Sequence, residues 1–176
     1  MTNLVDKSCE SVEWWTPDRV LDPVREYFSG IVMDPATAPS NPTGADHFCT
    51  REDNGLERNW DDGTFLNPPY GPEMRDWLAK LKEESLVGHE IIALLPGSRW
   101  EQQYFQESVF NEGLCGFCLV RKRLRFINGN TGEVCPSNPY PSILYGYNLS
   151  RWEEFRDIFS TIGTVVRTDE MVVHEE

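Results

Sequence analysis

The chain has 176 residues, of which 39% are hydrophobic, and its formal net charge at pH 7 is -13. This length suffices for one hydrophobic core but is short for two, so we predict one compact domain over residues 14–168, with a flexible arm at 1–13 and a charged tail at 169–176. The apolar stretches are far shorter than the roughly 20 residues of a membrane span, and the N-terminus lacks the apolar run of a signal peptide. These features exclude a membrane-spanning chain, and we expect a cytoplasmic protein.

Apolar residues at helical spacing alternate along the chain with short apolar runs that are typical of buried strands. In chain order the expected elements are a helix at 17–28, a strand at 31–33, a long loop at 35–63, a strand at 64–66, a helix at 72–84, a strand at 90–95, a helix at 99–110, strands at 114–120 and 142–147, a helix at 151–159 and a strand at 164–166. Thr16 is a possible cap of the first helix, and Pro17 suits its first position. This alternation predicts an α/β fold on a mostly parallel sheet, whose ligands bind at the carboxyl ends of the strands.

The sequence Asn67-Pro68-Pro69-Tyr70 stands between a predicted strand and a predicted helix, which is the edge where such sheets bind ligands. The amide oxygen of Asn67 and the carbonyl of Pro68 can each accept a hydrogen from a planar amine such as the exocyclic nitrogen of adenine, which localises the nitrogen lone pair. The two prolines fix the turn, and the ring of Tyr70 offers a face for a flipped base. The alternative is an ordinary turn, since Asn-Pro occurs three times in the chain.

Residues 121–126 read Arg-Lys-Arg-Leu-Arg-Phe and hold four of the 16 lysines and arginines of the chain. If this segment is extended, Arg121, Arg123 and Arg125 share one face, as a groove that follows nucleic-acid phosphates requires. The alternative is a solvated edge strand whose charges prevent aggregation.

The five cysteines are an odd number without a secretion signal, so we expect reduced thiols. Cys115 and Cys118 have the CxxC spacing of redox and zinc sites. However, a redox pair needs a helix N-terminus, and a zinc site needs two further ligands at matching spacing. Because neither is visible, we predict buried, unreactive cysteines and no metal site.

Several segments follow one another in a specific order: Trp14-Trp15-Thr16-Pro17, Met33-Asp34-Pro35-Ala36, Asp53-Asn54-Gly55-Leu56, Trp60, Phe65-Leu66-Asn67-Pro68-Pro69-Tyr70-Gly71 and residues 91–96. In this order they resemble the phage-type DNA N-6-adenine methyltransferase family, over about residues 14–100 with a looser likeness to residue 147. The resemblance implies a Rossmann-like fold, S-adenosylmethionine as the methyl donor, and duplex DNA with a flipped adenine as the partner.

The motifs and the resemblance together assign the site. The catalytic residues are Asn67, Pro68, Pro69 and Tyr70. The residues expected to hold the cofactor are Trp15, Thr16, Pro17, Asp34, Pro35, Ala36, Asp53 and Asn67. The residues expected to contact DNA are Tyr70, Arg121, Arg123, Arg125 and Phe126, with Phe126 stacking on the far side of the flipped base.

Two features of the cofactor site qualify this assignment. Asp53 is expected to accept a hydrogen bond from the adenine amine of the cofactor, and the alternative is a turn residue beside Asn54 and Gly55. Residues 37–40 read Thr-Ala-Pro-Ser where a glycine-rich loop is usual.

The acidic composition leaves other substrates open. Proteins that bind duplex DNA usually bring lysines and arginines to the phosphates, whereas here 16 such residues stand against 29 acids. A methyltransferase acting on a protein glutamine or an RNA adenine, and a non-enzymatic acidic phage protein that binds a host factor, are the alternatives. If the chain is phage-encoded, the expected location is the cytoplasm of the host cell.

Overall fold

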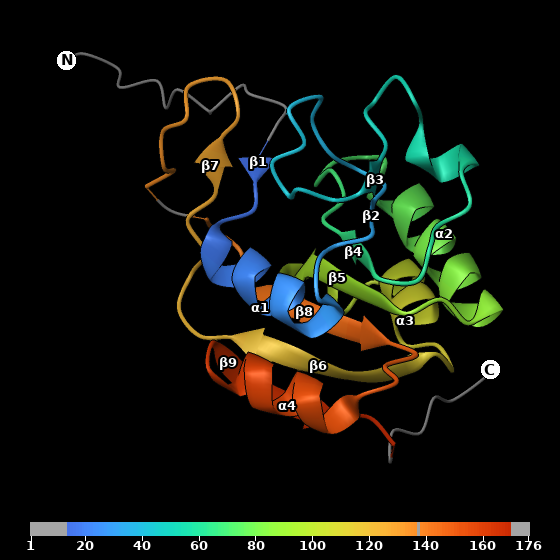
Figure 1. Ribbon diagram of the computed structural model, residues 1–176. Helices are drawn as coiled ribbons and strands as arrows, with labels where there is room; N and C mark the ends of the chain where they lie inside the picture. The colour runs from blue at the N-terminus through green and yellow to red at the C-terminus, as the bar shows by residue number, and fades with distance from the viewer. Residues whose placement is uncertain (1–13, 137, 170–176) are drawn as a thin grey trace.

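The computed structural model describes residues 14–136 and 138–169. Its centre is a seven-stranded sheet in the order β3-β2-β4-β5-β8-β6-β9 (Figure 1). Its strands are β2 (Met33–Asp34), β3 (His47–Phe48), β4 (Thr64–Leu66), β5 (Ile91–Pro96), β6 (Leu114–Val120), β8 (Ser142–Tyr147) and β9 (Gly163–Arg167). A separate antiparallel ribbon joins β1 (Trp14–Trp15) to β7 (Ile127–Asn128).

The sheet is mixed. Strands β3, β2, β4 and β5 pair in parallel, whereas β8 is antiparallel to both β5 and β6, and β9 is antiparallel to β6. The expected α/β architecture is confirmed, but the expected parallel order holds only for the first four strands. No helix separates β6 from β8, so the chain can turn back directly and β8 runs antiparallel to β6.

The two antiparallel partners of β8 run in the same direction as each other. Strand β6 therefore runs in the same direction as β5, and β2, β4, β5 and β6 all end on one side of the sheet. We call this side the carboxyl edge. The loops after these four strands meet there, as ligand-binding loops do in α/β folds.

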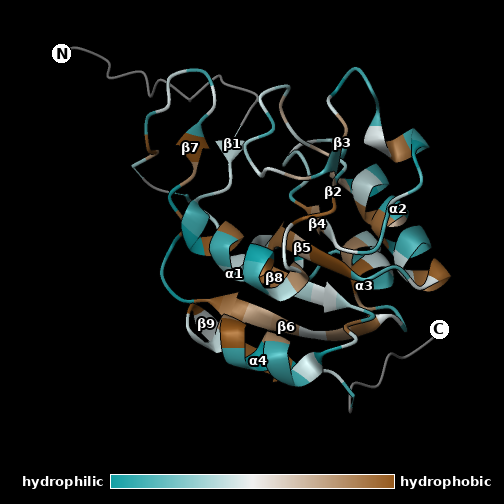
Figure 2. Cartoon of the chain, viewed as in Figure 1, coloured by the Kyte–Doolittle hydropathy of each residue, from teal (hydrophilic) through white to brown (hydrophobic). Residues whose placement is uncertain are grey.

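Helices cover both faces of the sheet. Helices α1 (Asp18–Phe28) and α4 (Trp152–Ser160) pack on one face, and α2 (Met74–Val87) and α3 (Gln103–Val109) pack on the other (Figure 1). Alternate residues of β5 divide between the two cores, with Ile92 and Leu94 facing α1 and α4. In Figure 2, β5 and β6 are brown in the centre, while the exposed surfaces of α1 and α4 carry teal segments.

Most of the expected elements are present with shifted ends. The first helix begins at Asp18 with Pro17 as its N-cap, and Thr16 makes no capping hydrogen bond, so its expected role as a cap is wrong. The helix expected at 99–110 is divided into the 3-10 turn η2 (Gly97–Arg99) and α3. The long loop holds only β3 and the 3-10 turn η1 (Gly55–Glu57). The short strands β1, β3 and β7 were not expected, because two residues carry no periodicity.

Cys49, Cys115 and Cys118 are free thiols. Burial raises the pKa of the Cys118 thiol to about 12, so it stays protonated and unreactive. Cys9 and the predicted arm at 1–13 lie outside the described residues, as does the predicted tail apart from Asp169. None of the helices in the described part of the chain is long and apolar enough to cross a membrane.

Phe155 offers a test of the core beneath α1 and α4. It is fully buried and stacks on Phe159, with ring centroids 4.4 Å apart. We expect Phe155→Ala to lower the free energy of unfolding by about 3 to 5 kcal/mol, because the change removes a buried ring and leaves a cavity. Leu86→Ala, at a side chain that is 53% exposed, should cost less than about 0.5 kcal/mol. Urea unfolding followed by circular dichroism measures both, and similar losses in the two variants would contradict this packing.

Candidate active site

A hydrogen bond joins two segments that lie far apart in the sequence. Strand β4 ends at Leu66 and places Asn67 at the carboxyl edge, as its position between strand and helix predicts. The Asn67 side-chain Nδ2 donates to the Thr16 hydroxyl oxygen over 3.0 Å. The turn after β4 is therefore tied to the residues that lead into α1.

The other end of the Asn67 amide has no partner. Its Oδ1 is buried and accepts no hydrogen bond from the described residues. A buried polar atom without a partner costs roughly 1 to 3 kcal/mol, so native proteins keep few of them. An unpaired acceptor at the carboxyl edge is what a ligand that donates a hydrogen bond would complete.

Trp15 supplies a second unpaired polar atom, in the residue that precedes Thr16. Its indole Nε1 is buried and has no hydrogen-bond partner among the described residues. Trp15 pairs with Ile127 in the β1–β7 ribbon and directly precedes Thr16, which holds Asn67. The residue with the unpaired donor therefore directly precedes the residue that binds Asn67.

The hydroxyl of Tyr70 ties this residue to β5. The hydroxyl donates to the Leu94 carbonyl over 3.4 Å, and its burial raises the pKa, so the phenol stays neutral. The residue as a whole is nevertheless 37% exposed. Phe126 packs edge-on against Tyr70, with the two ring centroids 6.4 Å apart at an interplanar angle of 80°. The two aromatic residues expected at the substrate base are thus in contact with each other.

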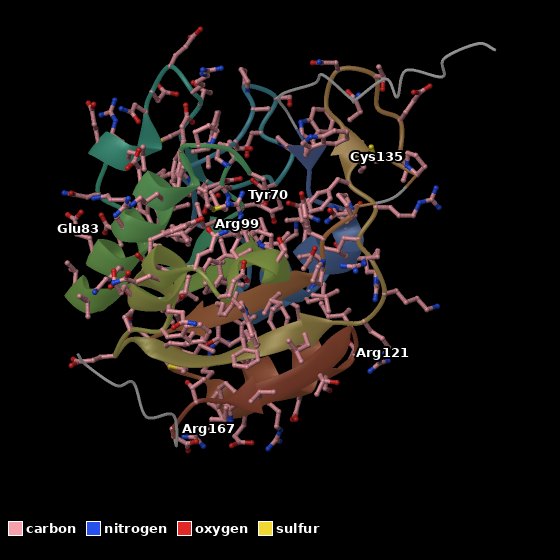
Figure 3. The ribbon with its side chains drawn as sticks, turned by 180° about the vertical axis from the view of Figure 1, so that it is seen from behind. Tyr70, Glu83, Arg99, Arg121, Cys135 and Arg167 are labelled. Atoms are coloured by element: carbon pink, nitrogen blue, oxygen red, sulfur yellow. The ribbon has the colours of Figure 1, made fainter. Side chains whose placement is uncertain are left out.

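A turn divides the basic segment. Strand β6 ends at Val120, and Lys122 has a φ of 64°, which turns the chain. The turn separates Arg121 from the face expected for all three arginines, whereas Arg123 and Arg125 alternate with the buried Leu124 and Phe126 and are both exposed. Figure 3 shows Arg121 at the periphery of the molecule, away from Tyr70.

Local contacts hold this basic segment against the domain. The carbonyl of Arg121 accepts a hydrogen bond from the Arg19 guanidinium, and Arg125 Nε donates to the Cys135 carbonyl over 3.4 Å. Leu124 and Phe126 are buried in the core beneath α1 and α4. The segment thus alternates buried apolar anchors with exposed arginines.

Asp34 is used inside its own loop. Its Oδ1 accepts from the Ala36 backbone N–H over 3.1 Å, and its Oδ2 accepts from the Thr43 hydroxyl over 2.8 Å. Burial raises the pKa of Asp34 to about 6, even though these hydrogen bonds act in the opposite direction. Asp34 thereby shapes the loop that replaces the usual glycine-rich one, and its contact with a cofactor stays a prediction.

Asp53 lies on the surface at the end of a neighbouring loop. Its Oδ2 accepts from the backbone N–H and the hydroxyl of Thr50, over 2.9 and 2.7 Å, and these hydrogen bonds lower its pKa. Gly55 then packs so closely on the residue after β2 that a Cβ there would lie 2.0 Å from the Pro35 carbonyl oxygen. The segments around Asp34 and Asp53 are therefore adjacent, as a common cofactor pocket requires, although the role of Asp53 itself stays a prediction.

Two residues at this edge belong to no motif. Thr43 had no signal in the sequence, because its bond to Asp34 depends on the path of the loop between them. Arg99 is the last residue of η2, which directly follows β5, and in the sequence only its position after a buried strand marks it. Among the described residues no group of histidine, cysteine, aspartate and glutamate side chains is suited to hold a metal ion.

Comparison with known proteins decides the family. Residues 5–174 match the family model of DNA N-6-adenine-methyltransferase (Dam). The chain belongs to this family. A DNA N-6-adenine-methyltransferase of Haemophilus phage HP1 is 27% identical over 146 residues, which cover 82% of this chain and 83% of the relative. The family match therefore extends well beyond residue 100, the point near which the likeness in the sequence motifs becomes looser.

The raised pKa of Asp34 predicts a pH dependence of stability. The folded protein holds this proton up to about pH 6, whereas the ordinary pKa of a free aspartate side chain is 3.8. The protonated carboxyl therefore favours the folded state below pH 3.8, and this contribution, at most about 3 kcal/mol, is lost as the pH rises from about 4 to about 6. We expect Asp34→Asn to remove this part of the pH dependence.

Urea midpoints measured from pH 4 to 7 compare the Asp34→Asn variant with the wild type. Asp53→Asn is the matched control, because Asp53 is exposed and should leave the loss of stability between pH 4 and 6 in place. A constant difference between wild type and Asp34→Asn across this range would show that Asp34 does not titrate as described.

Proposed function

We propose that this protein transfers a methyl group from S-adenosylmethionine to the N6 amine of adenine in DNA, with Asn67, Pro68, Pro69 and Tyr70 as its catalytic residues. Membership of the DNA N-6-adenine-methyltransferase family supports the reaction, and the phage HP1 relative carries the same name. The observation that carries the assignment of residues is the buried, unpartnered Oδ1 of Asn67 at the carboxyl edge.

The residues beside Thr16 fit the cofactor. S-adenosylmethionine carries a carboxylate, an ammonium group and an adenine, which need both donors and acceptors. Trp15 Nε1 is a free buried donor, and the Thr16 hydroxyl, which accepts from Asn67, still has its own proton to donate. When bound, the cofactor supplies an electrophilic methyl group on its sulfonium.

We assign the cofactor to the segments that meet at this end of the sheet. Pro17 is the N-cap of α1, next to Thr16. Gly55 packs against Pro35, which brings the segment of Asp53 against the segment of Asp34. Within them, Asp34 acts by holding the loop through Ala36, and the exposed Asp53 offers a carboxylate to the cofactor adenine. The full set is Trp15, Thr16, Pro17, Asp34, Pro35, Ala36, Asp53 and Asn67.

The turn after β4 prepares the base. Asn67 Oδ1 and the Pro68 carbonyl accept the two hydrogens of the adenine amine, which localises the nitrogen lone pair toward the methyl group. Positive charge builds on the nitrogen as the new bond forms, and the same two oxygens stabilise it. Neither oxygen is basic enough to keep the proton, so it passes to solvent. Pro68 and Pro69 hold both acceptors in place beforehand.

The aromatic pair holds the base. Tyr70 is 37% exposed as a residue, and its hydroxyl bond to the Leu94 carbonyl ties it to β5. Phe126 lies at the edge of the Tyr70 ring, on a segment that also carries the exposed Arg123 and Arg125. We assign Tyr70 and Phe126 to the flipped adenine, and Arg121, Arg123 and Arg125 to the DNA phosphates.

A labelling experiment tests the substrate. The protein is incubated with S-adenosylmethionine labelled in its methyl group together with adenine-containing duplex DNA, RNA and a protein extract. We expect label in the DNA, at adenine N6. Label that enters RNA or protein instead would overturn DNA as the substrate, and failure to bind the cofactor in calorimetry would overturn methyl transfer itself.

Asn67 is the residue to change. We expect Asn67→Ala to lower kcat for DNA methylation by roughly 100-fold to 1000-fold, because one preorganised acceptor for the developing charge is lost. Asn59→Ala, at an exposed asparagine outside the turn, should leave kcat unchanged. Single-turnover rates with labelled cofactor measure both, and full transfer by Asn67→Ala would contradict its catalytic role.

A further inference from the structure

We propose that Arg99 binds a DNA phosphate beside the flipped adenine, on the opposite face of the sheet from residues 121–125. The DNA backbone would then be held on both sides of the base. This inference rests on DNA as the substrate and extends the contact surface to a residue that no motif marks.

Arg99 lies on the turn after β5, the strand that pairs with the one before the catalytic turn. Leu66 of β4 pairs with Ala93 of β5, and the Tyr70 hydroxyl bonds the carbonyl of Leu94, so the turns after β4 and β5 leave the sheet side by side. Arg99 ends the short 3-10 turn that follows β5. In Figure 3, Tyr70 and Arg99 are labelled one above the other at the centre of the molecule, while Arg121 is peripheral.

Trp100 anchors this turn on the face covered by α2 and α3. Its ring packs edge-on against Phe110 and Phe117, with centroids 6.0 and 5.8 Å away, and its Nε1 donates to the Tyr145 hydroxyl. These partners belong to the core beneath α2 and α3. Arg99 is thus held at a defined place by the residue that follows it.

The basic segment 121–125 is anchored on the other face. Leu124 and Phe126 are part of the core beneath α1 and α4, and the Arg121 carbonyl is bound by Arg19 of α1. The ring of Tyr70 touches Phe126 on that side. A base held by these rings therefore has arginines on both faces of the sheet.

Arg99 is available to an anion. Its Nη1 donates to the neutral Gln102 Oε1 over 3.4 Å, and among the described residues no carboxylate pairs with its guanidinium. Among the described residues, the arginines and lysines that form ion pairs lie on α1, α2, β9 and the α4 region: Arg25, Lys80, Arg151, Arg156 and Arg167. A half-buried guanidinium held by an amide keeps further N–H donors, whose planar fork suits a phosphate.

The salt dependence of DNA binding tests this proposal. Each neutralised phosphate contributes a slope of about 0.9 to a plot of log Kd against log salt concentration. We expect Arg99→Gln to bind an adenine-containing duplex more weakly and with a slope smaller by about 1, while its affinity for S-adenosylmethionine stays the same. Fluorescence anisotropy between 50 and 200 mM salt gives the slope, in the range where the effect is large, and calorimetry gives the cofactor affinity.

Two further variants make the result specific. Arg167→Gln removes an exposed arginine at the end of β9, which runs antiparallel to β6 and therefore ends on the side opposite the carboxyl edge, and this variant should keep the wild-type slope. Arg99→Lys retains the charge and should restore the slope, even though the fork geometry is lost.

The outcomes separate this proposal from the one on which it rests. A wild-type slope for Arg99→Gln, in an enzyme that methylates DNA, would overturn the role of Arg99 alone. A weaker cofactor affinity with an unchanged slope would overturn it as well, and would place Arg99 at the cofactor. A wild-type protein that neither binds nor methylates DNA would overturn both proposals.

Discussion

The hydrogen bond from Asn67 Nδ2 to the Thr16 hydroxyl is the interaction on which the site depends. It uses the donor end of the amide, so the acceptor end, Oδ1, is left unpaired. It also places the start of α1, where the cofactor is expected, against the turn that is expected to hold the base. In the proposed mechanism one side chain therefore contacts both cofactor and substrate, and one hydroxyl sets its orientation.

The mixed sheet brings the second aromatic residue to this point. Because β8 enters antiparallel between β5 and β6, the strand β6 ends at the same edge as β4 and β5. The segment that follows β6 can then reach across the edge, and Phe126 meets Tyr70 there. The β1–β7 ribbon closes the same region, since it joins the residue after Phe126 to Trp15.

The charge distribution reconciles an acidic chain with a polyanionic substrate. The net charge of -13 repels a polyanion at long range, but at moderate salt this repulsion is screened beyond about 10 Å. Phosphate contacts depend instead on individual guanidinium groups at contact distance. Arg99, Arg123 and Arg125 have no carboxylate partner among the described residues. A few free arginines at the carboxyl edge therefore suffice for the proposed contacts, with a surface that is acidic elsewhere.

The sequence by itself determined the local features of this protein. The turn Asn67-Pro68-Pro69-Tyr70, the strand before it and the helix after it were predictable, because prolines and apolar runs act on their own neighbours in the chain. The direction of β8, the internal use of Asp34, the Tyr70–Phe126 contact and the position of Arg99 were decided only by the tertiary structure. Each of these depends on which distant segments pack together, and strand order and long-range packing leave no periodic signal in a single sequence.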